Sequence, residues 1–172
     1  MRSQLEALNR WIDEVAALTR PDRVQWCDGS DAEHRALVAL MLERGDLIAL
    51  NRQTHPDCYL HRSDPADVAR VEHLTYVCTR ERADAGPNNP WMAPAEAHAK
   101  LDALYAGCMR GRTMYVVPYC MGPIDSPIAR CGVEVTDSPY VVASMRIMTR
   151  MGSAALRRIE RDGRFVRGLH SI

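Results

Sequence analysis

The stretch from Gly107 to Gly152 constrains the fold more than any other part of this 172-residue chain. Within it, Thr113–Pro118 has the β-branched and aromatic residues that are typical of a strand. Gly132–Thr136 predicts a second strand, with valines on one face and a glutamate on the other. From Pro139 onward the apolar spacing favours a helix. Two strands and a helix in one short block indicate a sheet packed against helices.

The N-terminal part predicts two helices and two short strands. Apolar residues recur at three- and four-residue steps over Leu5–Leu18, and Pro21 closes this first helix. A short strand follows at Val24–Cys27. The second helix begins after Ser30, which we expect to cap it with Glu33 as the capping-box partner. The expected end of that helix is Gly45, and the expected strand after it is Leu47–Leu50.

The sequence pattern over residues 63–106 and 164–169 is less regular. Ser63-Asp64-Pro65 predicts a helix start with Asp64 as N-cap, and Leu74–Cys78 predicts a strand. A loop over Gly86–Pro94 leads into a helix over Ala95–Tyr105. Near the end, Arg164–Leu169 predicts a weak strand for which the sequence offers no evident neighbour.

These elements predict an α/β fold (mixed α+β), in which helices flank a mixed sheet. Residues 1–172 contain no internal repeat and no convincing boundary, so we expect a single domain. A chain of this length can bury roughly two-thirds of its unfolded surface, which is enough for a stable core.

The charge pattern excludes several classes of function. Twenty-two basic residues balance 22 acidic ones, which gives no argument for a nucleic-acid partner or an anionic membrane. No apolar run reaches the length of a membrane span. The only lysine is Lys100, and no glycine run precedes it, so the chain has no phosphate-binding loop of the G-x-x-x-x-G-K-[ST] type.

The cysteines do not suggest a metal site. No CxxC pair is present, and no second pair at zinc spacing follows Cys58 and His61. The N-terminus, MRSQLEALNRW, does not resemble a signal peptide, so we expect a cytoplasmic protein with reduced thiols. We interpret the six cysteines as small buried residues: Cys27, Cys58, Cys78, Cys108, Cys120 and Cys131.

Arg70 is the first candidate for ligand binding. A guanidinium group between a helix and a strand can present two parallel donors to a carboxylate, which a lysine cannot copy. The alternative is a surface arginine paired with Asp67 or Glu72.

Two further pairs of arginines are weaker candidates. Arg110 and Arg112 flank a glycine just before a strand, where they could form a small anion site. Alternatively, they orient the turn or pair with Asp137 or Glu134. If the segment from Arg146 to Arg150 is helical, the two arginines share one face of the helix. They could then face a cleft or pair with carboxylates, and we favour the pairing.

Five blocks of the sequence together resemble the GTP-dependent phosphoenolpyruvate carboxykinases, in the same order and over nearly the whole chain. The resemblance is to the N-terminal, substrate-binding part of that family. One departure is Tyr119, where the family usually has phenylalanine. Besides Gly107–Gly152, the blocks are PDRVQWCDGS (Pro21–Ser30), SDPADVARVE (Ser63–Glu72), DAGPNNPWM (Asp84–Met92) and GLHS (Gly168–Ser171).

The resemblance implies a role for the DVAR segment that ends at Arg70. In the family, the matching arginine contacts the carboxylate of oxaloacetate or phosphoenolpyruvate from a mobile loop. Glu72 would then help to hold the closed loop. By the same resemblance, His170 and Asp28-Gly29-Ser30 match family segments, and we interpret both as structural.

The family is a group of gluconeogenic lyases that decarboxylate oxaloacetate and use GTP to form phosphoenolpyruvate, GDP and carbon dioxide. The complete enzyme requires Mn²⁺ (or Mg²⁺) and GTP. The segments that hold them, including the GYGGN segment and the P-loop, would fall after Ile172. We therefore expect no catalytic residue and no metal ligand in this chain, and neither cofactor to bind it tightly. Its partners would be a substrate carboxylate and the missing C-terminal lobe, in cis or in trans.

Three interpretations of the chain follow from the sequence. It is the N-terminal part of a carboxykinase and inactive by itself, or a non-catalytic module that binds carboxylates through Arg70. The third interpretation is a passive folding unit with an exposed apolar face.

Overall fold

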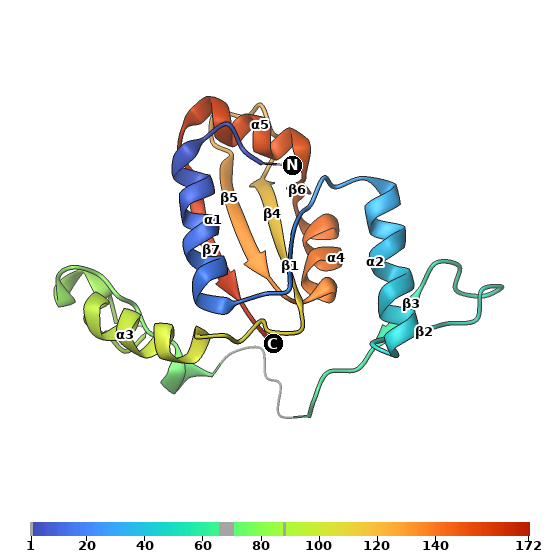
Figure 1. Ribbon diagram of the computed structural model, residues 1–172, viewed down its shortest axis with the longest axis horizontal. Helices are drawn as coiled ribbons and strands as arrows, with labels where there is room; N and C mark the ends of the chain where they lie inside the picture. Colours follow the sequence, from blue (N-terminus) through green and yellow to red (C-terminus); the bar gives the residue numbers. More distant parts are fainter. Residues whose placement is uncertain (1, 66–70, 88) are drawn as a thin grey trace. The chain divides into compact units, whose positions relative to one another are not determined.

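The computed structural model describes residues 2–65, 71–87 and 89–172 of the chain. Contacts between residues group the chain into two compact units (Figure 1). Met1–His61 and Gly107–Ile172 form the first, which we call the sheet unit, and Arg62–Ala106 forms the second, which we call the inserted unit. The assignment of residues 1–172 to a single domain stays a prediction.

A five-stranded mixed sheet organises the sheet unit, which confirms the predicted α/β class. Its main path runs through β1 (Arg23–Trp26), β4 (Thr113–Met121), β5 (Arg130–Thr136) and β7 (Val166–His170). The strands β1 and β4 are parallel, β4 and β5 antiparallel, and β5 and β7 parallel. The short β6 (Arg150–Met151) is antiparallel to β4, beyond the residues that pair with β1.

Side chains alternate along β4 and so give the sheet two apolar faces. Met114 and Val116 belong to one buried cluster, and Tyr115 and Val117 belong to another. All four side chains are buried. Both faces of the sheet therefore need a cover of helices.

Helices α1 (Glu6–Thr19) and α5 (Ser153–Asp162) cover the first face. The predicted apolar stripe of α1 is confirmed, because Leu8, Ile12 and Val15 are buried there. Full burial of one such side chain contributes roughly 1.5–3 kcal/mol to stability. The buried members of this cluster are Leu8, Trp11, Ile12, Val15, Met109, Met114, Val116, Val133, Val135, Leu156 and Ile159.

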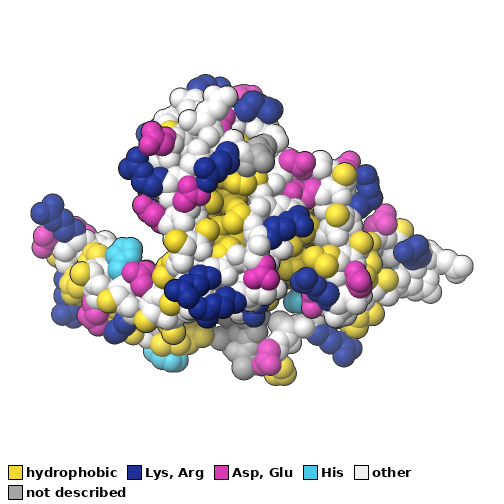
Figure 2. Space-filling model, in the orientation of Figure 1, with side chains coloured by type: hydrophobic (Ala, Val, Ile, Leu, Met, Phe, Trp, Pro, Cys, Tyr) yellow, Lys and Arg dark blue, Asp and Glu magenta, His cyan; other side chains and the backbone are white. Residues whose placement is uncertain are grey.

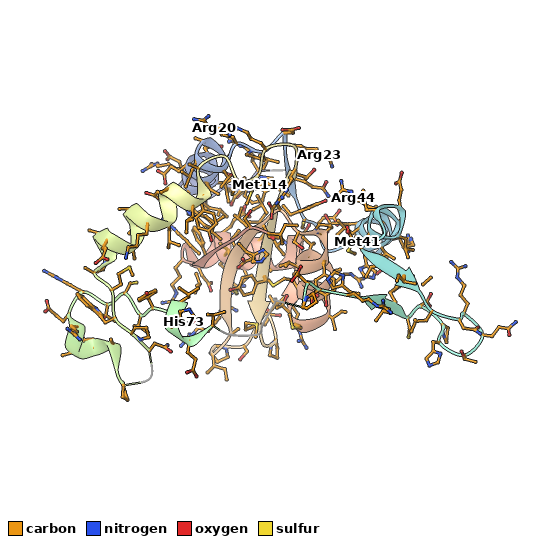
Figure 3. The ribbon with its side chains drawn as sticks, turned by 90° about the horizontal axis from the view of Figure 1, so that it is seen from below. Arg20, Arg23, Met41, Arg44, His73 and Met114 are labelled. Carbon is orange, nitrogen blue, oxygen red and sulfur yellow. The ribbon has the colours of Figure 1, made fainter. Side chains whose placement is uncertain are left out.

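Helices α2 (Asp31–Arg44) and α4 (Pro139–Met148) contribute to the cluster on the second face. Leu37 of α2 and Val142 of α4 pack with Tyr115 and Val117 of β4. Figure 3 shows Met41 and Arg44 on α2, and Met114 on the sheet. The predicted helix end at Gly45 is confirmed: this residue is left-handed, with φ of 80°.

A small antiparallel ribbon, β2 (Leu47–Ala49) with β3 (Tyr59–His61), follows α2. Leu47 packs against α2 in a third buried cluster. The His61 ring stacks on Tyr140 of α4 with 4.0 Å between the ring centroids. The ribbon is thereby joined to both helices of this face.

The inserted unit contains the 3₁₀ helices η1 (Glu72–Leu74) and η2 (Arg82–Ala85) and the helix α3 (Pro94–Tyr105). The helix predicted over Ala95–Tyr105 is confirmed as α3. The helix expected after Ser63-Asp64-Pro65 continues into residues 66–70, which lie outside the described part of the chain.

The strand predicted over Leu74–Cys78 is wrong. Only Val77 forms a bridge there, with Trp91. The preceding residues turn instead, because the Thr75 N–H donates to the Glu72 carbonyl at 3.1 Å and the Thr75 hydroxyl donates to the Val71 carbonyl at 2.7 Å. These local bonds satisfy groups that a strand would have had to pair with a neighbour.

The C-terminal region differs from the sequence prediction in two helices and agrees with it in the last strand. Helix α4 ends at Met148, because Thr149 has extended backbone and donates its hydroxyl to the Met145 carbonyl at 2.7 Å. Helix α5 was not predicted from the sequence. The strand predicted over Arg164–Leu169 is confirmed as β7, and its neighbour is β5.

Candidate functional site

The residue with the strongest predicted role, Arg70, lies outside the described residues, as does Asp67. Its predicted companion, Glu72, is the first residue of η1 in the inserted unit and is exposed. The roles of Arg70 and Glu72 in substrate binding therefore stay predictions.

Arg112 forms part of a buried polar junction around Asp137. The Arg112 guanidinium donates through Nη1 to Asp137 Oδ2 at 2.8 Å and to the Ile172 carbonyl at 2.7 Å. The Asp137 side chain is fully buried and also accepts from the Ser171 hydroxyl at 2.8 Å and from the Ile172 N–H at 3.1 Å. A buried carboxylate is stable only when such donors surround it. This geometry favours the structural alternative for Arg112, namely pairing with Asp137.

Arg110 occupies a different environment from Arg112. Its guanidinium lies over Gly107, where a Cβ atom would come within 2.8 Å of Arg110 Cζ. The turn that carries it is fixed to the end of α1, because the Gly107 N–H donates to the Leu18 carbonyl at 2.8 Å and the Met109 N–H to the Thr19 carbonyl at 3.0 Å. The two arginines therefore have different neighbours, and an anion contact at Arg110 or Arg112 stays a prediction.

The helical arrangement of Arg146 and Arg150 is wrong, because only Arg146 lies on α4 and Arg150 belongs to β6. Arg146 forms an ion pair with Asp31 at the start of α2. The pairing with a carboxylate that the sequence favoured is thus confirmed for Arg146. It joins the two helices that cover the second face.

The loop Asp28-Gly29-Ser30 serves as a turn and cap, as the sequence predicted. Ser30 Oγ accepts from the Glu33 N–H at 3.1 Å. The Glu33 carboxylate accepts from the Gly29 N–H at 2.9 Å and the Asp28 N–H at 3.2 Å, so the expected capping box is shifted by one to two residues. The bond from the Ser30 N–H to Asp28 lowers the pKa of the Asp28 carboxyl.

This loop lies directly against the turn between β6 and α5. The Ser153 N–H donates to the Asp28 carbonyl at 3.1 Å. A Cβ atom on Gly152 would lie 2.0 Å from the same oxygen, and Gly152 has φ of 93°. Only glycine fits this close approach of two main chains.

A row of polar side chains crosses the second face of the sheet and was not singled out from the sequence. It consists of Tyr119, Glu134, Thr136 and His170, which we call the polar row. Thr136 Oγ1 lies 2.9 Å from His170 Nδ1. Burial raises the pKa of the Glu134 carboxyl, and burial followed by the Glu134 charge raises the pKa of Tyr119.

Two glycines make room for the polar row. The Tyr119 ring lies over Gly132, where a Cβ atom would come within 2.7 Å of the ring, and the Glu134 carboxylate lies over Gly168. The structural interpretation of His170 agrees with its bond to Thr136. The sequence pattern of β5 indicated one member of the polar row, because it placed Glu134 on the face of the strand opposite to the valines.

The described residues do not fit a metal centre. Across residues 2–65, 71–87 and 89–172, no group of three or more His, Cys, Asp or Glu side chains is placed to hold a metal ion. We therefore assign no metal ligand to this part of the chain.

On the face shown in Figure 2, basic and acidic side chains lie interspersed around apolar ones. No helix in the described part of the chain is long and apolar enough to cross a membrane.

Comparison with known proteins places the chain in a family. The family model described as the phosphoenolpyruvate carboxykinase N-terminal domain matches residues 10–172. A phosphoenolpyruvate carboxykinase [GTP] from Chlamydia pneumoniae is 54% identical over 167 residues, which cover 97% of this chain and 28% of the relative. The corresponding protein of Chlamydia abortus is 53% identical over 98% of the chain and 28% of the relative.

A relative from another genus gives the same result. The phosphoenolpyruvate carboxykinase [GTP] of Anaeromyxobacter dehalogenans is 54% identical over 162 residues, or 94% of the chain and 27% of the relative. The chain thus spans between a quarter and a third of the length of these relatives. With its α/β sheet unit and a family match over residues 10–172, the chain belongs to the GTP-dependent phosphoenolpyruvate carboxykinase family and matches its N-terminal domain.

Proposed function

We propose that this chain supplies the N-terminal, carboxylate-binding part of an enzyme that converts oxaloacetate and GTP into phosphoenolpyruvate, GDP and carbon dioxide. The observation that carries the proposal is the family match over residues 10–172, together with relatives named for this activity. The substrate is a small dicarboxylate or its phosphorylated product. The remainder of the enzyme would be supplied by a C-terminal lobe.

Arg70 carries the binding step in this proposal. A guanidinium fork forms two parallel hydrogen bonds to a carboxylate and so fixes the orientation of the substrate. Charge-assisted bonds of this kind are worth about 1.5–3 kcal/mol. Orientation of the substrate lowers the barrier of a later phosphoryl transfer without any covalent chemistry by the arginine.

The complete enzyme would also need GTP and a divalent metal ion, for which we propose Mn²⁺ or Mg²⁺. When bound, the metal would stabilise negative charge that develops on the substrate oxygens. The described residues of this chain do not offer a cluster that could hold it. The sequence also lacks a lysine-containing phosphate loop. Both groups would therefore be held by the C-terminal lobe, and the expected location of the enzyme is the cytoplasm.

The proposal is tested by calorimetric titration of the 172-residue chain with phosphoenolpyruvate and with oxalate. We expect saturable binding that Arg70→Ala weakens by roughly tenfold or more, as loss of a charge-assisted contact requires. Arg70→Lys should recover only part of it, because lysine lacks the fork. Arg80→Ala, at an exposed position in the same unit, is the matched control and should bind like the unchanged chain. Equal affinity in Arg70→Ala and the unchanged chain would overturn the proposal.

A further inference from the structure

Cys120 and Cys131 lie directly opposite each other in the sheet. They are register partners across the antiparallel strands β4 and β5. Directly opposed residues in an antiparallel pair point to the same face, so the two thiols lie side by side. Among the strand pairs of the described residues, no other register pair brings two cysteines together.

The hydrogen-bond pattern shows which kind of pair this is. The carbonyls of Val116 and Pro118 accept from the Cys27 N–H at 2.9 Å and the Gly152 N–H at 2.8 Å, on the edge of β4 that faces β1 and β6. Main-chain groups alternate between the two edges of a strand, so those of Cys120 point to the same edge. Cys120 and Cys131 therefore form a non-hydrogen-bonded pair.

This kind of pair suits a disulfide bond. In non-hydrogen-bonded pairs the Cα atoms are about 4.5 Å apart, which falls within the range of about 4.4–6.8 Å that disulfides span. The Cβ atoms are usually slightly farther apart than a relaxed disulfide allows. Closure would therefore draw the strands together, and a bond formed in this way is easily reduced.

The two thiols differ in access. Cys120 is fully buried, whereas Cys131 is half-buried and lines a cavity of about 320 Å³. Three arginines also line this cavity: Arg130, Arg158 and Arg164. Asp162 lines it too and pairs with Arg158, so the lining keeps a net positive charge. An anionic reagent would be attracted to it and would reach Cys131 first.

We propose that Cys120 and Cys131 form a dithiol site that closes to a cross-strand disulfide by exchange with an anionic low-molecular-weight disulfide such as oxidised glutathione. The Cys131 thiolate attacks one sulfur of the reagent and releases one thiol, forming a mixed disulfide. Cys120 then attacks Cys131 Sγ and displaces the second thiol. The two cysteines lose two electrons and two protons, and the reagent gains them as two thiols.

The surroundings of Cys131 set the rate of this exchange. Burial, followed by the hydrogen bond with the Cys120 thiol, raises the pKa of Cys131 to about 12. Only the thiolate is nucleophilic, so the reaction should be slow at pH 7 and accelerate about tenfold per pH unit up to pH 9. The two cysteines should therefore form a disulfide during prolonged contact with the oxidant and stay reduced during a brief contact.

The other thiols provide an internal comparison. The interpretation of all six cysteines as buried is wrong for Cys58 and Cys78, which are exposed, so they should take up glutathione without forming a bond within the same molecule. Cys27 is buried in the cluster on the opposite face, and burial raises its pKa. Cys108, the remaining thiol, is half-buried and packs against the first cluster, so its peptide is mapped as well.

The test treats the 172-residue chain and its Cys58→Ser/Cys78→Ser variant with oxidised glutathione at pH 7, 8 and 9. Free thiols are then blocked and peptides are mapped by mass spectrometry without reduction. We expect one cross-linked peptide pair containing Cys120 and Cys131, with a rate that rises about tenfold per pH unit. Cys120→Ala should instead retain glutathione on Cys131, and Cys131→Ala should leave Cys120 reduced.

Circular dichroism identifies any variant that fails to fold, and the measurement on the unchanged chain does not depend on the variants. The proposal is overturned if Cys58 takes up glutathione while Cys120 and Cys131 both remain free at pH 9. It is also overturned if Cys131 retains glutathione in the unchanged chain and the bond to Cys120 does not form.

Discussion

At the scale of single residues, side chains on the second face of the sheet carry most of the unexpected chemistry. Glu134 alternates with valines that are fully buried, and its carboxylate lies over Gly168 of the neighbouring strand. Burial takes water away from this carboxylate and disfavours its charged form, which is why the pKa of Glu134 is raised.

The raised pKa of Glu134 predicts a pH dependence of stability. Folding favours its protonated form, so the free energy of unfolding is largest below the usual carboxyl pKa and falls as the pH rises through the raised value. Glu134→Gln removes this fall, so the variant should gain stability relative to the unchanged chain between pH 4 and pH 7. Urea unfolding at several pH values measures the difference.

The control for this prediction is Glu14→Gln, at an exposed position on α1. Its unfolding free energy should follow that of the unchanged chain across the same pH range. A constant difference between Glu134→Gln and the unchanged chain from pH 4 to pH 7 would contradict the prediction.

At the scale of elements, two main chains approach each other closely where the β1–α2 loop meets the β6–α5 turn at Gly152. An alanine there would place its Cβ atom 2.0 Å from the Asp28 carbonyl oxygen, and the backbone would have to move. Gly152→Ala should therefore cost about 3 kcal/mol or more, or prevent folding. The matched control is Gly163→Ala at the other end of α5, where φ is 66° and the space is open.

Gly163→Ala should cost only about 1–2 kcal/mol, the usual penalty for a left-handed residue with a side chain. Denaturant unfolding, or the loss of helical circular dichroism, distinguishes the two variants. Equal losses for Gly152→Ala and Gly163→Ala would show that the main chains at Asp28 can separate without cost.

The sequence predicted well the elements that are determined by residues close together in the chain. The stripe of α1, the cap at Ser30, the end of α2 at Gly45 and the strands β4 and β5 all depend on residues within a few positions. The faces of β5 were also predicted correctly, because side chains alternate with a period of two.

The elements that were missed depend on distant partners. Helix α5 contains many charged residues, and its apolar stripe of Ala155, Leu156 and Ile159 is too short to stand out. The strand β7 was predicted, but its neighbour β5 was not, because the two strands come together only in the folded sheet. For the candidate site, the role of Arg112 required the positions of Asp137 and Ile172, which are 25 and 60 residues away.

At the scale of the whole molecule, the chain spans only 28% of the length of its relative from Chlamydia pneumoniae. We predict no measurable formation of phosphoenolpyruvate from oxaloacetate, GTP and Mn²⁺ by the pure 172-residue chain. Electrostatic stabilisation of the transferred phosphoryl group dominates this type of reaction, and orientation by arginine does not replace it.

A coupled assay with a longer relative as positive control checks this prediction. Turnover by the chain that depends on both GTP and the metal would refute it. Binding of phosphoenolpyruvate without turnover would agree with both the proposed function and this prediction.

The sheet unit is assembled from two separate stretches of chain, and this has a consequence for its synthesis. Arg23 of β1 pairs with Thr113 of β4, which lies 90 positions later in the chain. At about 5–20 residues per second, β1 would wait roughly 5–20 s on the ribosome before its partner is made. During that time the inserted unit is completed, so the sheet closes late and β1 remains an unpaired strand that nascent-chain chaperones have time to bind.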